Sequence, residues 1–281
     1  MEKKEIMPNN IDMNEFFNAS TGKKPTSEEF VVFKKKIASL INLDLSNYKN
    51  TQMERRITSL MQRNGIDNLE SYFTVLKASK ERLEEFLNML TINVTEFFRN
   101  PEKFVELETK YLPQLLKDNS RLKIWSAGCS IGAEIYSISM ILDKMGVLDR
   151  CDLIASDFDE TILKKAQSGT YSKLEVGTIQ SGYEKYFKPI GSDKFQVDSK
   201  LISKVKFVRG DLLNSRFDAG FNIIICRNVV IYFTEEAKDQ LYKKFYDSLK
   251  HDGILFIGCT ERINTYREIG FNLASSFFYK K

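Results

Sequence analysis

The chain has 281 residues, of which 42% are hydrophobic and 28% charged, so it is long enough for one large core or two modest ones. No apolar run approaches the ~20 residues of a membrane span, and the N-terminus lacks the apolar core of a signal peptide. The net charge of +4 argues only weakly for a nucleic-acid partner, and equally for a patch that meets an acidic protein surface.

The first part of the chain is predicted to be helical after a polar tail. Residues 1–26 are polar, with a short turn expected around Met13–Phe17. At Ser27, a candidate N-cap, apolar residues begin to recur at helical spacing, and no strand pattern occurs before Arg121. The expected helices, which form a small all-helical domain over residues 27–91, span about 27–41, 46–63, 69–77 and 80–90.

The charge of this helical domain is uneven. Between Lys34 and Arg63 there are seven basic residues against two acidic ones. Lys49, Arg56 and Arg63 recur at intervals of seven, which predicts that they share one helix face. Most such faces are simply solvated, and the alternative is a docking surface for an acidic partner helix.

Residues 92–120 are predicted to be a linker and a helix. The linker contains Phe97, Phe98 and Arg99, and Pro101 can start the helix that is expected over about 102–116. On its own, Arg99 is typical of a surface arginine.

The remainder, residues 121–281, is predicted to alternate strands and helices. Strands are expected over about 122–125, 151–155, 205–208, 221–226 and 254–258, helices over 161–168 and 234–249, and extended segments within 271–279. This order predicts an α/β fold with a doubly wound, mostly parallel, Rossmann-like sheet. Residues 170–204 interrupt the pattern as an insertion, with a helix expected at Ile179–Phe187 and a short strand near Phe195–Val197.

The four cysteines have no metal-type spacing. All of them fall on or just after predicted strands (Cys129, Cys151, Cys226 and Cys259). Buried free thiols are therefore favoured over disulfides, and we expect a reduced, cytoplasmic protein without a metal site.

The stretch Ile124–Tyr136, which reads IWSAGCSIGAEIY, is where a ligand is expected. A strand, a glycine turn and a helix in this order direct backbone N–H groups toward the carboxyl end of a strand, where nucleotide-like ligands bind in open α/β sheets. Gly128 and Gly132 are four positions apart, so the turn is not G-x-G-x-x-G, and the glycines alone are a weak indication.

The second predicted strand ends at Ser156-Asp157-Phe158-Asp159. A carboxylate at this place can accept both ribose hydroxyls of a nucleotide, or it can cap the next helix. We expect Asp157 to contact the ligand and Asp159 to cap the helix.

The residues after the fourth strand bear on the chemistry, because a dehydrogenase and a methyltransferase that uses S-adenosylmethionine share this strand and helix order. Arg227, Asn228 and Tyr232 would orient a carboxylate or amide substrate. No catalytic base is apparent, since the sole histidine, His251, is expected in a helix-to-strand turn as a solvated cap. An ionised carboxylate is already nucleophilic and a sulfonium donor carries its leaving group, so such a transfer needs alignment and desolvation more than proton transfer.

Several motifs together resemble one family. They are Asn93-Val-Thr95-Glu-Phe-Phe-Arg99, the segment WSAGCS from Trp125, Glu134 with Tyr136-Ser137, Ala155-Ser-Asp157, and CRNVVIYF from Cys226 to Phe233. Over about residues 28–280 the chain resembles the chemotaxis receptor glutamate methyltransferases of the CheR type. The resemblance implies methyl esterification of glutamates on the cytoplasmic helical domain of transmembrane chemoreceptors, with S-adenosylmethionine as donor and S-adenosylhomocysteine as product. It also implies a cytoplasmic monomer with neither a nucleic-acid partner nor membrane insertion.

The resemblance assigns roles by matching positions. The implied cofactor contacts are Asn93, Thr95, Arg99, Glu134, Asp157, Asp211, Leu212, Cys226 and Arg227. The implied catalytic residues are Arg227, Tyr232 and Arg99, of which the first two resemble those closest to the transferred methyl and the substrate carboxylate. The basic helix with Lys49, Arg56 and Arg63 resembles the family's receptor-docking helix, and the insertion resembles its small β-subdomain.

Three positions depart from the family pattern. Ile131 and Ala133 stand where the family has Thr and Glu in its glycine turn, and Asp211 stands where it has Asn. Asp keeps an acceptor and loses a donor, so a cofactor contact that depends on the donor would be lost. The insertion also lacks a glycine-rich loop, which gives no ground for expecting it to bind a receptor's C-terminal tether peptide.

Three other functions stay open on the sequence. A nucleic-acid methyltransferase fits the fold and the basic charge, although the chain has neither an Asn/Asp-Pro-Pro-aromatic motif nor a Pro-Cys pair. A non-catalytic cofactor-binding module that docks on receptors fits the three departures. A dehydrogenase fits the fold alone.

Overall fold

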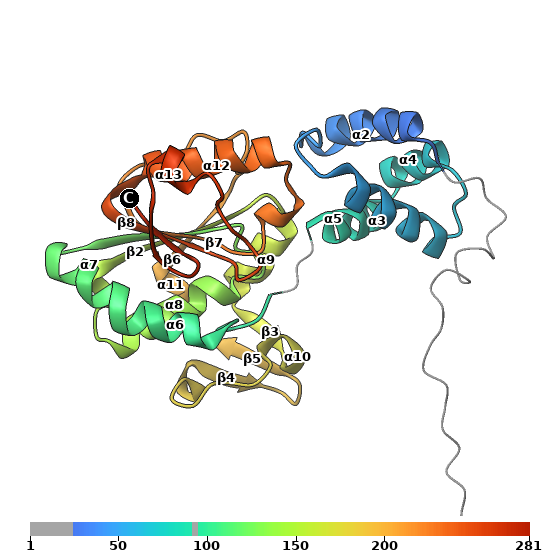
Figure 1. The fold of residues 1–281 in the computed structure, drawn as a ribbon. Helices are drawn as coiled ribbons and strands as arrows, with labels where there is room; N and C mark the ends of the chain where they lie inside the picture. The colour runs from blue at the N-terminus through green and yellow to red at the C-terminus, as the bar shows by residue number, and fades with distance from the viewer. Residues whose placement is uncertain (1–24, 92–94) are drawn as a thin grey trace, which may run out of the picture. The chain divides into compact units, whose positions relative to one another are not determined.

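The computed structural model describes residues 25–91 and 95–281, which divide into two compact units (Figure 1). The first unit comprises the described residues up to Leu45 together with Met53–Phe86, and the second comprises Ser46–Gln52 and Leu87–Lys281. The turn expected at Met13–Phe17 and the predicted cofactor contact Asn93 lie outside the described residues. None of the helices in these ranges combines the length and the apolar character that crossing a membrane requires.

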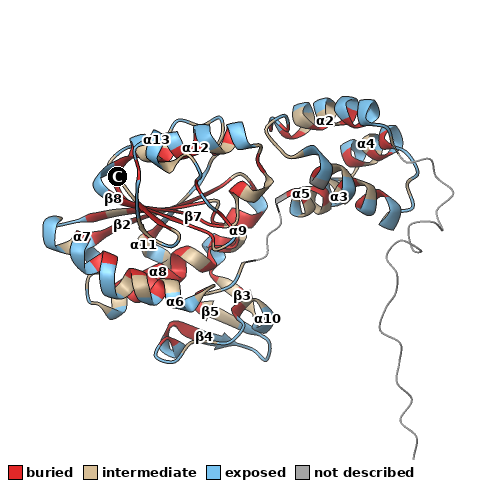
Figure 2. Ribbon diagram, viewed as in Figure 1, coloured by how far each residue is buried: buried red, intermediate tan, exposed pale blue. Residues whose placement is uncertain are grey.

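The first unit is helical, as predicted. Its helices, two of which extend past the boundary of the unit, are α2 (Ser27–Ile41), α3 (Asn50–Arg63), α4 (Leu69–Ala78) and α5 (Lys80–Thr91). Buried positions alternate with exposed ones along these helices (Figure 2). Their apolar faces meet at an aromatic centre, where the ring of Phe33 lies 5.9 Å from that of Tyr72 and 6.3 Å from that of Phe86. These three side chains are almost fully buried, so the core of this unit is built by helical periodicity.

Two helix starts differ from the sequence prediction. Thr26 rather than Ser27 is the N-cap of α2, because its hydroxyl accepts the Glu29 N–H at 3.3 Å and the Glu29 carboxylate accepts the Thr26 N–H at 2.6 Å. Helix α3 begins at Asn50, so Lys49 precedes the helix instead of lying on its face. The reason is that the Lys49 N–H donates to the carbonyl of Tyr232 at 2.9 Å and is not available to a helix.

The second unit contains a seven-stranded sheet in the order β6-β2-β1-β7-β8-β10-β9. The strands are β1 (Leu122–Ala127), β2 (Cys151–Asp157), β6 (Val205–Arg209), β7 (Phe221–Cys226), β8 (Leu249–Ile257), β9 (Asn272–Ser275) and β10 (Phe278–Lys280). The first five in spatial order pair in parallel, whereas β10 pairs antiparallel with both β8 and β9. The predicted mostly parallel sheet is confirmed.

Helices cover both faces of this sheet (Figure 1). They are α6 (Pro101–Glu106), continued by a π-helical turn at Leu107–Tyr111 into α7 (Leu112–Asp118), then α8 (Ala133–Lys144), α9 (Glu160–Ser168), α11 (Ser199–Lys204), α12 (Glu235–Ser248) and α13 (Tyr266–Ile269). Because alternate residues of a strand point to opposite faces, Ile124 packs in the cluster that contains α8 residues and Trp125 in the cluster that contains α12 residues. Every position of β7 is buried, as in a central parallel strand.

A small antiparallel sheet is inserted between α9 and β6. Its strands, in the order β3-β5-β4, are β3 (Thr170–Ser172), β4 (Phe187–Ile190) and β5 (Lys194–Val197), and α10 (Lys173–Val176) follows β3. The predicted strand near Phe195 is confirmed. The helix predicted at Ile179–Phe187 is wrong, because Gly182 adopts a φ of 90°, only a 3₁₀ turn forms at Glu184–Tyr186, and Phe187 enters β4.

His251 also differs from its predicted place. It lies within β8, which begins directly after α12, and not in a turn between the two. The side chain is exposed, with Nδ1 2.9 Å from the carboxylate of Asp252. The sole histidine of the chain is therefore a surface residue, as the sequence suggested.

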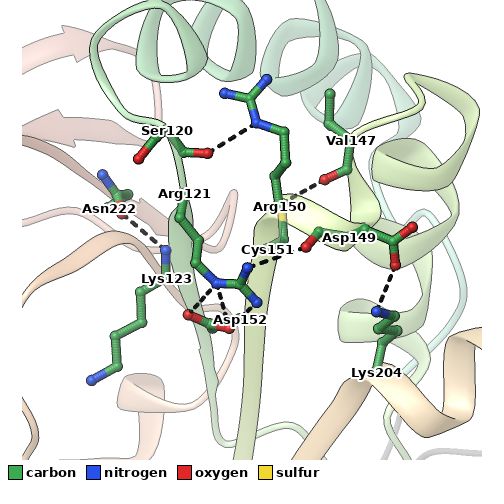
Figure 3. A network of polar contacts seen from close by, with 10 residues as sticks. All are labelled: Ser120, Arg121, Lys123, Val147, Asp149, Arg150, Cys151, Asp152, Lys204 and Asn222. Atoms are coloured by element: carbon green, nitrogen blue, oxygen red, sulfur yellow. Dashed lines mark hydrogen bonds and ion pairs between the residues drawn. The ribbon is translucent and has the colours of Figure 1, made fainter.

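A polar cluster joins the amino ends of β1 and β2 (Figure 3). The Arg121 guanidinium donates three hydrogen bonds of 2.8, 2.9 and 3.0 Å to the carboxylate of Asp152 on the neighbouring strand. Arg150 donates to the carbonyl of Ser120 at 2.9 Å, and the Lys123 N–H donates to Asn222 at 2.9 Å. About half of the Arg121 and Asp152 side chains is exposed, so solvent screens this pair and it contributes little to stability.

The small sheet is attached to the glycine loop by a buried tyrosine, which gives a first prediction. The Tyr171 hydroxyl of β3 donates to the Ile131 carbonyl at 2.6 Å, and Tyr171 is only 1% exposed. Replacing Tyr171 by Phe leaves this carbonyl buried without its donor, so we expect the free energy of unfolding to fall by about 1–2 kcal/mol in urea denaturation.

Tyr266→Phe is the control, since the Tyr266 hydroxyl makes no hydrogen bond to any described residue and its loss is expected to change stability by less than about 0.5 kcal/mol. Equal changes in the two variants would contradict the role given to Tyr171.

Candidate active site

Three loops meet at the carboxyl edge of the parallel sheet. Gly128 ends β1 with a φ of 80°, and a Cβ at this position would lie 2.6 Å from Cγ2 of Val229 in the loop after β7. The N–H groups of Gly128 and Cys129 donate to the carbonyl of Ser156, at the end of β2, at 2.8 and 2.9 Å. Only a glycine at position 128 lets the β1 and β7 loops approach this closely.

Asp157 fixes the glycine loop from the end of β2. Its two carboxylate oxygens accept the Ser130 N–H at 2.8 Å and the Asp159 N–H at 3.1 Å. Burial raises the pKa of Asp157, and the backbone N–H donors oppose that rise. Asp159 caps α9 by accepting the N–H groups of Thr161 and Ile162 at 2.8 and 3.2 Å, so its predicted role as the cap is confirmed.

A buried ion pair joins the glycine loop's helix to the end of β7. The Arg227 side chain is 3% exposed, and its Nη1 lies 3.5 Å from the carboxylate of Glu134 in the first turn of α8. The Ser126 hydroxyl donates to the other Glu134 oxygen at 2.9 Å. Burial raises the pKa of Glu134, while the positive charge of Arg227 opposes that rise. The Arg227 guanidinium also lies over the ring of Phe256, with 4.7 Å to its centroid.

Arg227 also holds the linker that precedes α6. Its Nη2 donates to the carbonyl of Arg99 at 2.9 Å and to Oδ1 of Asn100 at 2.8 Å. Phe98 and Asn100 adopt left-handed φ values of 52° and 62°, which non-glycine residues adopt only when their surroundings impose them. The buried Phe98 N–H is satisfied by the hydroxyl of Ser137 at 2.9 Å, so the linker is fixed at both residues.

Tyr232 lies on the same loop as Arg227, in a 3₁₀ turn at Val230–Tyr232. Its carbonyl accepts the Lys49 N–H, and the Thr234 N–H donates to the carbonyl of Asn47 at 2.8 Å. The rings of Tyr48 and Phe233 meet edge to face at 5.1 Å. Residues 47–49 therefore brace the loop that carries Tyr232.

Comparison with known protein families identifies this arrangement. The model of the CheR methyltransferase SAM binding domain matches residues 93–276, and that of the CheR methyltransferase all-alpha domain matches residues 28–91. The chain belongs to the CheR methyltransferase family. It is an S-adenosylmethionine-dependent methyltransferase, so the predicted family and cofactor are confirmed.

Curated relatives agree over most of the chain. A "Chemotaxis protein methyltransferase" of Listeria monocytogenes is 36% identical over 255 residues, which cover 90% of this chain and 97% of that protein. "Chemotaxis protein methyltransferase Cher2" of Pseudomonas putida is 32% identical over 84% of this chain and 90% of its own length. A "Chemotaxis protein methyltransferase" of Borreliella burgdorferi is 32% identical over 91% of this chain and 95% of its own length.

The structure brings most of the predicted site residues of this CheR-family protein to one edge. Arg99, Glu134 and Arg227 are in one hydrogen-bonded cluster, and Asp157 contacts the adjoining glycine loop. Cys226, at the end of β7, is fully buried in the core cluster that contains α12 residues. Thr95 is half-buried in the linker.

Asp211 has its carboxylate engaged within its own turn. One oxygen accepts the Leu213 N–H at 2.8 Å, and the other accepts the side-chain amide of Asn214 at 2.7 Å. The turn after β6 therefore depends on a side-chain oxygen as acceptor, which the Asn found in the family at this position would also provide. The adjacent Leu212 is 8% exposed.

Sequence reasoning missed Glu261, a buried carboxylate in the turn after β8. It is 7% exposed and accepts the Gly258 N–H at 2.6 Å. Burial raises its pKa, while the backbone N–H groups of Asn228 and Val230 and the charge of Arg227 oppose that rise. Among the described residues its Oε1 has no hydrogen-bond partner. The signal for it was a glutamate three residues after the glycine that ends the fifth predicted strand.

The close approach of the β7 and β8 loops gives a second prediction. A Cβ at Gly258 would lie 2.8 Å from the backbone nitrogen of Asn228 and 2.8 Å from the Glu261 carboxylate. Gly258→Ala therefore forces the loop that follows Arg227 to move, and we expect the free energy of unfolding to fall by about 1–3 kcal/mol in urea denaturation.

Gly210→Ala is the matched control, because the nearest atom to its Cβ would be the Ser215 hydroxyl at 3.8 Å. Neither glycine has a positive φ, so the two variants differ only in the space that is available for the new Cβ atom. A decrease in the free energy of unfolding for Gly210→Ala as large as that for Gly258→Ala would contradict the close approach of the β7 and β8 loops.

Proposed function

We propose that this protein transfers the methyl group of S-adenosylmethionine to glutamate side-chain carboxylates of chemoreceptors, as a protein-glutamate O-methyltransferase that acts in chemotaxis adaptation. The family and the names of the curated relatives support the pathway. The observation that supports the chemistry is that the half-buried Tyr232 lies on the same loop after β7 as the buried Arg227, while the sole histidine, His251, lies exposed on β8. An acceptor that is already ionised needs no general base.

Within this proposal the cofactor is held by the carboxyl-edge loops. The site fits it, because the Asp157 carboxylate accepts backbone N–H groups from Ser130, Phe158 and Asp159 and keeps an acceptor position for a ribose hydroxyl. The cofactor supplies a methyl group on a positively charged sulfur, and the buried Glu134 carboxylate provides negative charge nearby. The residues that we propose to contact the cofactor are Asn93, Thr95, Arg99, Glu134, Asp157, Asp211, Leu212, Cys226 and Arg227.

The catalytic roles that we propose follow from how far the side chains of Arg227 and Tyr232 are exposed to solvent. Arg227 is buried and donates to Glu134 and to the linker, so it aligns the site. Tyr232 is only half-buried and is the side chain that we propose to face the receptor glutamate, and Arg99, half-buried on the linker, is the third residue to which we give a catalytic role. Rate enhancement would come from alignment and from removing water around the glutamate carboxylate, which makes it a better nucleophile.

The receptor partner that we propose is the cytoplasmic helical domain of transmembrane chemoreceptors, bound by a monomer in the cytoplasm. Arg56 and Arg63 lie on α3, whereas Lys49 precedes it with Nζ 3.2 Å from the carboxylate of Glu235. The docking surface proposed here therefore rests on the two arginines, whose charge suits an acidic receptor helix.

The decisive experiment uses methyl-labelled S-adenosylmethionine with receptor-bearing membranes, followed by mild alkali. We expect label that is released as volatile methanol, because carboxyl esters hydrolyse under these conditions and methylated amides do not. Label that resists alkali, or cofactor binding with no transfer to any receptor, would overturn the glutamate assignment. The latter result would favour a docking module without catalysis.

The cofactor assignment has its own test in Asp157→Asn. The amide presents an N–H₂ group where both Asp157 oxygens accept backbone N–H groups, so one donor faces another and the ribose contact is lost. We expect binding of S-adenosylhomocysteine, measured by titration calorimetry, to weaken by at least about tenfold, a change of about 1.4 kcal/mol.

Asp118→Asn, on the exposed end of α7, is the control and should bind as the wild type does. Unchanged affinity in a folded Asp157→Asn protein would remove Asp157 from the cofactor site.

A further inference from the structure

The loop between β6 and β7 packs on the unit through a few apolar side chains: Leu212 is buried, and the Phe217 ring lies 4.7 Å from that of Trp125. Residues 210–220 contain no helix, although they connect two parallel strands of the central sheet. The loop borders a cavity of about 340 Å³, which is lined on the sheet side by Trp125, Ile154 and Val208. The hollow beside the loop leaves part of it without van der Waals contacts, so polar contacts also help to fix its position.

The turn at the start of this loop is shaped by its own hydrogen bonds. Besides the Asp211 carboxylate contacts, the Asp211 N–H donates to the Ser215 hydroxyl at 3.1 Å, and the Ser215 N–H donates to the Asp211 carbonyl at 2.8 Å. These bonds hold residues 211–215 in a compact turn. They do not attach the turn to the rest of the unit.

Lys244 provides a polar attachment from helix α12, in addition to the buried Leu212 side chain. Its Nζ donates to the carbonyls of Leu213 at 2.5 Å, Ser215 at 3.2 Å and Leu212 at 3.5 Å. An ammonium group has three donors, and here three carbonyls of one turn receive them. Nζ also lies 5.1 Å from the centroid of the Phe217 ring.

The part of helix α12 that carries Lys244 is firmly packed. Leu241 and Phe245 flank Lys244 on α12, and both are fully buried in the core beneath the helix. Lys244 is half-buried, and burial lowers its pKa while the charge of Asp211 opposes that change. An Asp at position 211 therefore serves the turn in two ways, as its internal acceptor and as a counter-charge for the lysine.

We propose that Lys244 is a positioning residue for the cofactor, which sets the affinity for S-adenosylmethionine by holding the Asp211–Leu212 turn against α12. This rests on the proposed function, in which Asp211 and Leu212 contact the cofactor. Lys244 acts through the turn and takes no part in methyl transfer, so it affects cofactor binding and leaves the chemical step unchanged.

The test compares Lys244→Met with Lys243→Met. Methionine keeps the apolar stem and removes the three donors in both variants, but Lys243 is exposed and among the described residues contacts only its own helix, through an ion pair with Asp247 and a cation–π contact with Tyr246. We expect Lys244→Met to weaken S-adenosylhomocysteine binding five- to thirtyfold and to raise KM for S-adenosylmethionine to match. The kcat at saturating cofactor should stay within twofold of wild type, and Lys243→Met should change neither quantity.

Weaker cofactor binding with an unchanged kcat distinguishes positioning of the turn from a loss of the folded state, because a variant that unfolds loses kcat as well. Lys244→Met protein that melts within a few degrees of Lys243→Met and binds S-adenosylhomocysteine within twofold of wild type would overturn the proposal. A lowered kcat with unchanged binding would overturn it too.

The results that would overturn the proposed function differ from those that would overturn the role of Lys244. Wild-type protein that binds S-adenosylhomocysteine but transfers no alkali-labile label would overturn the glutamate assignment, while the affinity comparison for Lys244 still decides the present proposal. Wild-type protein without affinity for S-adenosylhomocysteine would overturn both.

Discussion

The second unit depends on satisfying one buried guanidinium. A charge that is 3% exposed has lost its hydration, and leaving it unpaired would cost several kcal/mol. The partners of Arg227 come from distant parts of the chain, with Glu134 on α8 and Arg99 and Asn100 on the linker before α6. Although its Nε–H has no hydrogen-bond partner among the described residues, pairing of the two Nη groups joins the linker, the first helix after the glycine loop and the end of β7 in one site.

The parallel sheet supplies the edge at which this can happen. Strands β2, β1, β7 and β8 all point their carboxyl ends in one direction, so the loops that follow them are neighbours in space. The opposite edge is fixed by exposed contacts such as the Arg121–Asp152 pair. At the carboxyl edge the glycines at 128 and 258 remove the Cβ atoms that would keep adjacent loops apart.

Each loop at that edge is anchored by one charged side chain that bonds to backbone groups. Asp157 accepts from the glycine loop, Glu261 accepts from the turn after β8, and Lys244 donates to the turn after β6. Charged hydrogen bonds are stronger than neutral ones, and more so where water is excluded. Such anchors hold a loop in one position without filling the space that a cofactor needs.

The sequence by itself determined the helical first unit, the parallel sheet, the cap at Asp159 and the family, because periodicity, turn residues and short motifs are local. It misplaced the start of α3 and the expected helix at 179–187, where a backbone pairing and a glycine with positive φ overrode local propensity. Only the tertiary structure revealed Asn100, Glu261 and Lys244 as supports of the site. Asn100 contacts Arg227 across 127 residues, and a contact that long leaves no local pattern from which it could be predicted.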